Sequence, residues 1–278
     1  MKAKRITFKL KRYPKKKPAK TAKVVIRRLP TRPAPVAPKE PGQEYPMRIN
    51  RYLAAQGAST RRGADELITK RRVYINGRVA LLGDKVDEGD EVEVRGVGKP
   101  KAFKYFAYNK PRGVITHSPQ GDDEEDIKNS VSKFPELADT FPVGRLDKDS
   151  YGLIILTNDG RITDRLLNPE REHDKEYVVM TRENLREGFA KRMELGVNIE
   201  GYQTKPCKVE VTGERSFRIT LTEGKKHQIR RMVEAMKNQV TDLKRVRILN
   251  IKMGPLAPNS FRAITDKELA EFLKRLGL

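Results

Sequence analysis

The chain has 278 residues and a formal net charge of +22, with 59 Lys and Arg against 37 Asp and Glu. This length allows one large domain, or a small one and a medium one. The positive surplus indicates a polyanionic partner, nucleic acid first. We find neither the run of about 18 apolar residues that a membrane span needs nor a secretory signal, so we expect a soluble, cytoplasmic protein.

Neither crosslinks nor cofactors are expected from the composition. Cys207 is the single cysteine, so a disulfide within the chain is excluded and inert packing is the expectation for this thiol. His117, His173 and His227 are far apart in the sequence and lack the close ligand spacing of zinc sites. We therefore expect no metal and no cofactor.

Residues 1–46 are predicted to form a disordered basic tail. They hold fifteen Lys or Arg against two acids, Glu40 and Glu44, a net charge of +13. Dense prolines interrupt any helix, so we expect disorder until the tail meets RNA or another polyanion. A mitochondrial transit peptide is the alternative, because no acid precedes Glu40. The excess of Lys over Arg, the missing serine and the prolines argue against it.

Residues 47–95 are predicted to form a small α/β unit. A short helix over Arg48–Gln56 precedes a second helix, which Ser59 or Thr60 can cap. A tight hairpin follows over residues 73–80, with Asn-Gly at its centre supplying the positive φ angles of a type I′ turn. Basic residues gather in the first part of this unit and acids in residues 84–93, so one face is expected to be positive.

Segment 96–104 is a predicted linker, and residues 105–278 are predicted to form a larger unit. Its expected strands are Tyr105–Tyr108, Leu153–Thr157, Tyr177–Thr181, Lys208–Val211, Phe217–Leu221 and Ile248–Lys252. Its expected helices lie near Asp159–Leu167, Leu185–Leu195, Lys226–Lys237 and Asp266–Leu276. Because helices do not separate the strands regularly, the pattern favours an α+β fold with a mixed, mainly antiparallel sheet.

The stretch FPVGRLDKDSYGLIILTNDG, residues 141–160, carries the first candidate for chemistry. Its apolar run Leu153–Leu156 is predicted to be a buried strand that ends at the turn signal Asn158-Asp159-Gly160. Asp147 precedes this strand. A carboxylate at the edge of a buried strand loses much of its hydration, so it has to form an ion pair or take part in chemistry. Asp147 is therefore the first candidate for a catalytic residue.

A predicted helix near residues 226–237 carries two candidate arginines, Arg230 and Arg231. Its predicted buried stripe consists of Ile229, Met232, Val233 and Met236, at helical spacing. At about 100° per residue, Arg230 falls on the rim of this stripe and Arg231 on the far side. Arg230 could therefore reach a buried carboxylate, while Arg231 meets solvent or phosphate.

Taken together, the motifs resemble the small-ribosomal-subunit-type (RsuA) family of pseudouridine synthases. The residues that carry this resemblance are Asn109–Gly113, Phe141–Gly160, Lys175-Glu176-Tyr177, Thr204–Val209 and His227–Met232. The unit at 47–95 resembles an S4 RNA-binding domain, through Ser59–Ala64 and Val73–Gly77. The resemblance covers about residues 47–276 and leaves the tail unexplained. GRLD followed by GLIILTNDG is a long, specific signal, whereas KPRG alone would be weak.

The resemblance implies an enzyme that isomerises uridine to pseudouridine in RNA without a metal or redox cofactor. Asp147 would be its catalytic carboxylate, acting as nucleophile or as base. Arg230 would pair with Asp147 and keep it ionised. Tyr177 would lie against the flipped uracil, and Arg145 would fill the space left by that base or hold a phosphate.

RNA contacts are expected in both units. In the S4-like unit, phosphates would be bound by Arg51, Arg61, Arg62, Arg71 and Arg72. In the larger unit, Lys110 and Arg231 are expected to contact RNA. Lys244, Arg245 and Arg247 could extend this track, although solvated basic residues on a strand are an equal alternative. The acidic run at residues 122–126 is expected on a loop away from RNA.

Large-subunit (23S) ribosomal RNA is the expected partner of a monomeric enzyme, either naked or in a precursor particle. A tRNA or small-subunit rRNA substrate stays open, as does a non-catalytic ribosome-assembly factor with the same fold. A carbohydrate-cleaving enzyme that pairs Asp147 with Asp159 is disfavoured, because Asp159 belongs to a turn signal and the charge suits RNA. Two places depart from the family pattern, namely Tyr151 and the segment Asn259–Arg262.

Overall fold

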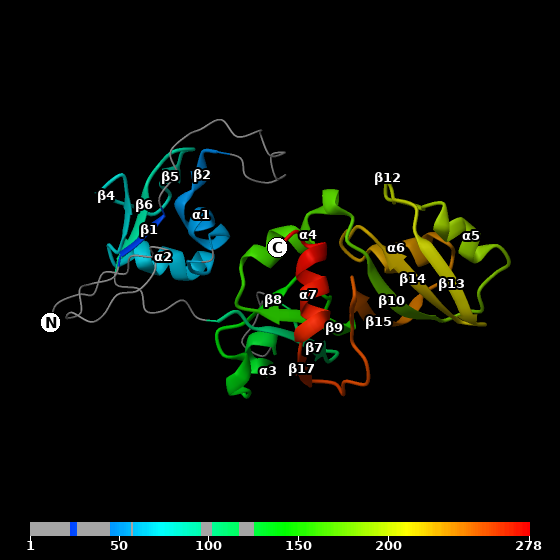
Figure 1. Ribbon diagram of the computed structural model, residues 1–278. Helices are drawn as coiled ribbons and strands as arrows, with labels where there is room; N and C mark the ends of the chain where they lie inside the picture. Colours follow the sequence, from blue (N-terminus) through cyan, green and yellow to red (C-terminus); the bar gives the residue numbers. More distant parts are fainter. Residues whose placement is uncertain (1–22, 27–44, 57, 96–101, 117–124) are drawn as a thin grey trace. The chain divides into compact units, whose positions relative to one another are not determined.

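The computed structural model describes residues 23–26, 45–56, 58–95, 102–116 and 125–278. The chain divides into two compact units, Met1–Ala102 and Phe103–Leu278 (Figure 1). Most of the predicted tail, residues 96–101 of the predicted linker, His117 and residues 122–124 of the acidic run lie outside the described residues. In the described ranges, no helix is both long and apolar enough to cross a membrane.

The N-terminal unit combines two helices with short strands, as predicted. The helices are α1 Ile49–Ala55 and α2 Arg61–Thr69, and the Thr60 side chain caps α2 by accepting the amide of Gly63 at 3.0 Å. Strands β3 Val73–Ile75 and β4 Arg78–Val79 form the hairpin, with φ angles of 49° at Asn76 and 80° at Gly77. The predicted cap and type I′ turn are both confirmed.

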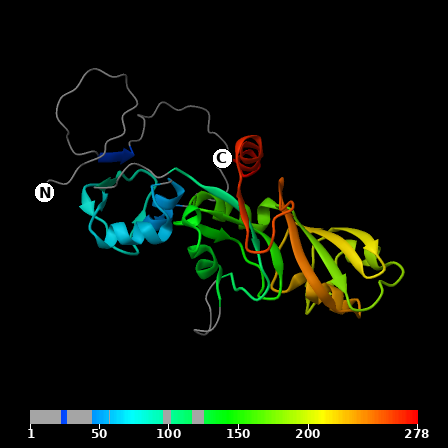
Figure 2. The ribbon, with the colours of Figure 1, turned by 90° about the horizontal axis from the view of Figure 1, so that it is seen from below.

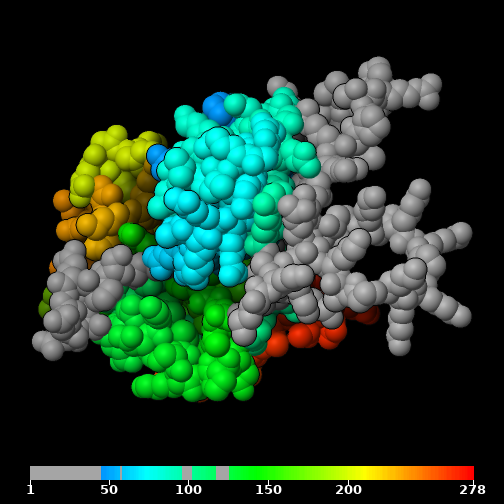
Figure 3. Space-filling model, turned by 90° about the vertical axis from the view of Figure 1, so that its left-hand side faces the viewer, coloured from blue at the N-terminus to red at the C-terminus, as the bar shows by residue number. Residues whose placement is uncertain are grey.

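One sheet of this unit has the order β1-β6-β3-β4, and β2 pairs separately with β5. The strands not yet defined are β1 Lys23–Ile26, β2 Met47–Arg48, β5 Lys85–Val86 and β6 Val92–Arg95. Apolar residues of both helices and of β3 and β6 form its core, including Leu53, Ile68 and Val73. Figure 3 shows the described residues of this unit in blue to green-cyan.

Strand β1 is a difference from the predicted disordered tail. It pairs antiparallel with β6, from Lys23 opposite Arg95 to Ile26 opposite Val92. The segment contains three β-branched residues in a row, which favour extended backbone, and the free edge of β6 offers them main-chain partners.

The C-terminal unit is built on one long sheet of order β13-β14-β10-β15-β9-β7-β17. Its strands are β7 Tyr105–Lys110, β8 Phe141–Val143, β9 Tyr151–Thr157, β10 Lys175–Thr181, β13 Lys208–Gly213, β14 Ser216–Leu221, β15 Val240–Ile248, β16 Ile251–Lys252 and β17 Phe261–Ala263. Among the described strand pairs, β15 with β9 is parallel and the rest are antiparallel. The predicted mixed, mainly antiparallel sheet is confirmed.

Helices cover the two halves of this sheet separately (Figures 1 and 2). The remaining elements are α3 Ile127–Ser132, α4 Arg161–Leu167, α5 Phe189–Glu194, α6 Gln228–Ala235, α7 Asp266–Arg275, the 3-10 turns Pro135–Leu137 and Pro169–Arg171, and the small hairpin β11 Asn198–Ile199 with β12 Tyr202–Gln203. Helices α4 and α7 pack on β7 and β9, whereas α5 and α6 pack on β10, β13 and β14. The two halves meet where β15 joins β9, next to the residues that precede β9.

Two predicted elements need correction, and one helix was not predicted. The expected strand Ile248–Lys252 is instead the end of the long strand β15, a turn with Leu249 at φ 50°, and the short strand β16. Helix α5 is shorter than predicted because Gly188 has a positive φ of 69°. Helix α3 was not predicted, and Asp126 caps it by accepting the amide of Asn129 at 2.7 Å. Asp126 is therefore the N-cap of α3 and not part of a free acidic loop.

Gly152 makes the junction between β9 and β15 possible. It pairs with Arg245 in the parallel register and has a φ of 106°. A Cβ at this position would lie 2.3 Å from the carbonyl oxygen and 2.8 Å from the amide nitrogen of Arg245. Because both atoms are main chain, neither can move aside without shifting β15.

We expect Gly152→Ala to lower the free energy of unfolding by about 3 kcal/mol, from backbone strain plus this clash. Gly201→Ala is the matched control, because Gly201 has a similar φ of 84° but nothing within 4 Å of its added Cβ. It should cost only about 1 kcal/mol. Urea unfolding of both variants measures the difference, and equal losses would show that the close approach of β15 is unimportant.

Candidate active site

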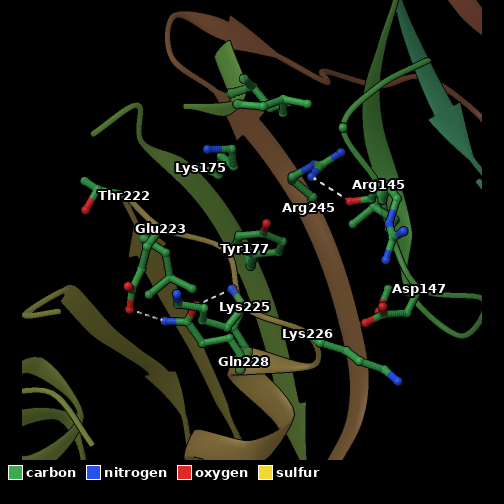
Figure 4. A pocket seen from close by; sticks show the side chains of 18 of the residues that line it. Arg145, Asp147, Lys175, Tyr177, Thr222, Glu223, Lys225, Lys226, Gln228 and Arg245 are labelled. Carbon is green, nitrogen blue, oxygen red and sulfur yellow. Dashed lines mark hydrogen bonds between the residues drawn. The ribbon is translucent and has the colours of Figure 1, made fainter. Parts of the chain in front are cut away.

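A pocket of about 460 Å³ opens at the junction between β9 and β15. Its walls come from the segment before β9, from the start of β10, and from the loop between β14 and α6. Figure 4 shows Asp147 and Arg145 on one wall, Glu223 and Gln228 on the other, and Tyr177 between them in this view. The three motif segments of the sequence are thus brought to one cavity.

Asp147 is held by main-chain contacts on both sides of its loop. Thr116 Oγ1 donates to the carbonyl of Leu146 at 2.8 Å and accepts the Leu146 amide at 3.0 Å. The Ser150 amide donates to the carbonyl of Asp147 at 3.1 Å. The side chain of Asp147 keeps 40% of its exposure, so its loop is held in place while its carboxylate is open to the pocket.

Arg245 is the buried guanidinium of this pocket. It is 3% exposed, its Nε donates to the Leu153 carbonyl at 2.7 Å, and its Nη1 donates to the Arg145 carbonyl at 3.3 Å. Its Nη2 is buried without a hydrogen-bond partner among the described residues. Arg245 therefore ties β15 to the loop that carries Asp147, and keeps the N–H groups of its Nη2 without a partner beside the cavity.

Arg230 is placed differently from the prediction. Its Nη1 donates to the Val240 carbonyl at 3.3 Å, and it does not line the pocket. Within the described part of the chain, the ion-pair contact of Asp147 is with His227, whose Nε2 lies 3.6 Å from Asp147 Oδ1. The side chain of Arg230 turns along the helix rim towards the start of β15, so its predicted ion pair with Asp147 is not formed.

Arg231 also differs from its predicted contact with solvent or phosphate. Its Nη2 donates to Glu200 Oε2 at 2.5 Å and to the Ile199 carbonyl at 3.3 Å. These bonds connect α6 to the small hairpin of β11 and β12, which is a structural use of the guanidinium.

Lys110 was predicted to contact RNA but is completely buried. Its Nζ donates to the carbonyls of Val114 at 2.7 Å and Pro111 at 2.9 Å. Burial lowers the pKa of Lys110 to about 8, although the nearby Asp147 carboxylate opposes this. The buried ammonium thus closes the turn after β7, whose Gly113 amide bonds the Lys148 carbonyl at 2.9 Å, and so supports the loop of Asp147.

Tyr177 and Lys175 lie on the same face of β10 and both line the pocket. Tyr177 is half-buried and pairs in register with Arg245. The ammonium of Lys175 donates to the His173 carbonyl at 2.9 Å. Burial, then the charge of Arg245, lower the pKa of Lys175 to about 8. An aromatic ring therefore lies among cations, a combination that suits a nucleotide.

Asp159 is excluded as a catalytic partner of Asp147. It is fully buried, accepts the Tyr105 hydroxyl at 2.9 Å, and is paired with Arg161 at 2.7 Å. It does not line the pocket. The two-carboxylate geometry of a carbohydrate-cleaving enzyme is therefore not present at Asp147.

The other predicted RNA contacts are exposed. Arg145 is exposed and lines the pocket, and in the N-terminal unit all five predicted arginines are exposed, namely Arg51, Arg61, Arg62, Arg71 and Arg72. Cys207 is a half-buried free thiol, and burial raises its pKa to about 11. In the ranges that the structure describes, no group of three His, Cys, Asp or Glu could hold a metal ion.

Comparison with known proteins agrees with this geometry. Residues 104–235 match the family model for RNA pseudouridylate synthase, and residues 47–92 match the S4 domain. The dual-specificity RNA pseudouridine synthase RluF of Escherichia coli K12 is 38% identical over 232 residues, which cover 82% of this chain and 79% of that protein. The chain belongs to the RsuA/RluF family of pseudouridine synthases. It is an RNA-modifying isomerase whose S4 domain binds RNA.

Further relatives of this pseudouridine synthase support the assignment. The ribosomal large subunit pseudouridine synthase B of Bacillus subtilis is 32% identical over 230 residues, covering 80% of this chain and 93% of that protein. A solved structure described as a pseudouridylate synthase superimposes with a TM-score of 0.60 at 27% identity, covering 83% of this chain and 99% of that one.

Several pocket residues were not assigned a role from sequence. They are Lys175, Lys225, Lys226, His227 and, left open there, Arg245. Lys175 could have been found, because residues two apart on a strand share a face and Tyr177 was already a candidate. Arg245 could not, because three basic residues lie close together on β15 and only the pairing of that strand decides which one faces the cavity.

We expect Lys110 to give folding stability a characteristic pH dependence. Its folded pKa of about 8 is below the ordinary 10.5, so between these values the unfolded chain binds more protons. Its contribution to stability therefore rises with pH, by at most about 1.4 kcal/mol per pH unit. Urea unfolding from about pH 7.5 to about pH 9.5 should show Lys110→Met falling progressively further below the wild type. A constant difference over this range would contradict the buried, depressed lysine.

Proposed function

We propose that this pseudouridine synthase modifies a uridine of large-subunit (23S) ribosomal RNA. The large-subunit specificity in the name of the Bacillus subtilis relative supports this substrate class. The term dual-specificity in the name of the Escherichia coli relative makes a second RNA, such as a tRNA, the alternative to test. The strongly positive chain suits either polyanion.

The observation that carries the catalytic proposal is the placement of Asp147, Tyr177 and Arg245 around one cavity. Conversion of uridine breaks the N1–C1′ bond, turns the uracil and joins C5 to C1′, after which C5 loses a proton and N1 gains one. We propose that Asp147 acts at the ribose, as nucleophile at C1′ or as base. Tyr177 lies against the flipped uracil, where an aromatic face offsets lost stacking.

The basic groups are proposed to hold the RNA. Arg145, Lys225 and Lys226 line the mouth and are exposed, so they are suited to phosphates next to the flipped nucleotide. The buried Arg245 holds the loop of Asp147 and offers the two N–H groups of its Nη2 to the substrate. The exposed arginines of the S4 domain bind phosphates and position the RNA.

Replacing Asp147 with Asn keeps the shape and removes the reactive carboxylate. We expect Asp147→Asn to lower pseudouridine formation on the order of 10³-fold or more. Carbodiimide-based mapping on unmodified 23S rRNA, 16S rRNA and tRNA transcripts, with wild type and variant, measures this. The wild type should modify a 23S site. A site made equally by both proteins would refute the role of Asp147, and modification of tRNA or 16S rRNA alone would refute the proposed substrate.

The proposed RNA contacts of the S4 domain are tested by Arg61→Gln with Arg62→Gln, both at the start of α2. Loss of two phosphate contacts should weaken RNA binding and reduce the salt dependence of log K by about 1.4. Turnover at saturating RNA should stay unchanged. Lys274→Gln, at an exposed position of α7, is the control with one cation removed elsewhere. An unchanged salt slope in the double variant would place the RNA on another surface.

A further inference from the structure

His227 faces the catalytic carboxylate from the loop between β14 and α6. Its Nε2 lies 3.6 Å from Oδ1 of Asp147, and both side chains are near half exposure, at 48% and 40%. Among the described residues, His227 is the one residue whose side chain lies within ion-pair distance of Asp147. The separation is slightly longer than a hydrogen bond, and contacts of this kind commonly shorten when substrate binds.

The backbone at His227 is in the left-handed conformation, with φ 52° and ψ 27°. For a residue with a side chain this conformation costs on the order of 1 kcal/mol, and it persists only where the surroundings determine it. It turns the chain directly into α6. A regular helical turn at this position would point the imidazole elsewhere, so the strained residue and its contact with Asp147 occur together.

The buried carboxylate of Glu223 anchors this loop through hydrogen bonds. It is 5% exposed and accepts hydrogen bonds from Tyr202 Oη at 2.6 Å, the Lys205 amide at 3.0 Å and Gln228 Nε2 at 2.7 Å. Gln228 Oε1 in turn accepts the Lys225 amide at 2.9 Å. Figure 4 shows the bonds that Gln228 makes with Glu223 and with Lys225, on the wall opposite Asp147. Both ends of the loop are therefore tied to a single buried carboxylate.

We propose that His227 is a positioning residue for Asp147, and that the Glu223 network holds it in place. The imidazole N–H directs Oδ1 and leaves Oδ2 facing the ribose. The loop from Glu223 to Gln228 is then a rigid bracket rather than a mobile flap, because its buried anchor has three donors. This inference rests on the proposed role of Asp147 at the ribose.

Asn is the sharpest replacement for His227, because it tolerates the left-handed conformation but is too short to reach Asp147. We expect His227→Asn to lower kcat on the order of 10- to 100-fold, with KM for RNA changed less than about 3-fold. His227→Gln, whose amide places an N–H donor at a similar reach, should recover kcat to within about 5-fold of the wild type. A general loss of structure would not be rescued by Gln.

Lys237→Asn is the matched control. Lys237 is exposed, follows the other end of α6, has a φ of 60° and does not line the pocket. The same substitution in the same backbone conformation should leave kcat within about 2-fold of the wild type.

A double-mutant cycle tests the network. Glu223→Gln should lower kcat while the melting temperature shows that the protein stays folded, and adding it to His227→Asn should cause little further loss, because both act through the same contact. If Glu223→Gln does not fold, Tyr202→Phe removes one bond to Glu223 and is tested in the same way. If the fold-losses of kcat in the two single variants multiply in the double variant, the two residues act independently and the coupling is overturned. Wild-type kcat in His227→Asn, with Asp147→Asn inactive, would overturn the positioning role. Activity in Asp147→Asn would instead refute the proposed function of Asp147.

Discussion

The guanidinium of Arg245 joins three parts of the catalytic unit through main-chain contacts. It comes from β15, donates to the Leu153 carbonyl in β9, and donates to the Arg145 carbonyl two residues before Asp147. Gly152 lets β15 approach β9 closely enough for these bonds. The position of Asp147 thus depends on a strand junction that only a residue without a side chain permits.

Two lysines at this site lose much of their water, namely Lys175 in the pocket lining and the buried Lys110 behind the loop of Asp147. Burial lowers the pKa of both lysines, because it removes water from the ammonium and so disfavours the charged form of each. Groups with a perturbed pKa are typical of functional sites. Arg245 differs, since two of its N–H groups are already used by carbonyls.

The departures from the family pattern have structural explanations. Tyr151 donates its hydroxyl to Asp242 at 2.8 Å, and the guanidinium of Arg112 lies over its ring at 4.7 Å. Asn259 takes a φ of 58°, the conformation for which a glycine is otherwise used, and accepts the Tyr108 hydroxyl at 2.7 Å. Both substitutions therefore add contacts next to the catalytic unit's core without entering the pocket.

Short-range patterns in the sequence determined the local elements and the candidate segments. Rules that act over a few residues predict the buried strand Leu153–Leu156, the Asn76-Gly77 turn and the Thr60 cap. The same kind of rule made Asp147 a candidate catalytic residue. The tertiary structure alone decided which arginine holds the loop of that aspartate. Basic residues lie close together on β15, and a bulge opposite Glu176 and Tyr177 sets Arg245 against Tyr177. Because a shift of one residue moves a side chain to the other face of a sheet, no local pattern could select Arg245 over Arg230 or bury Lys110.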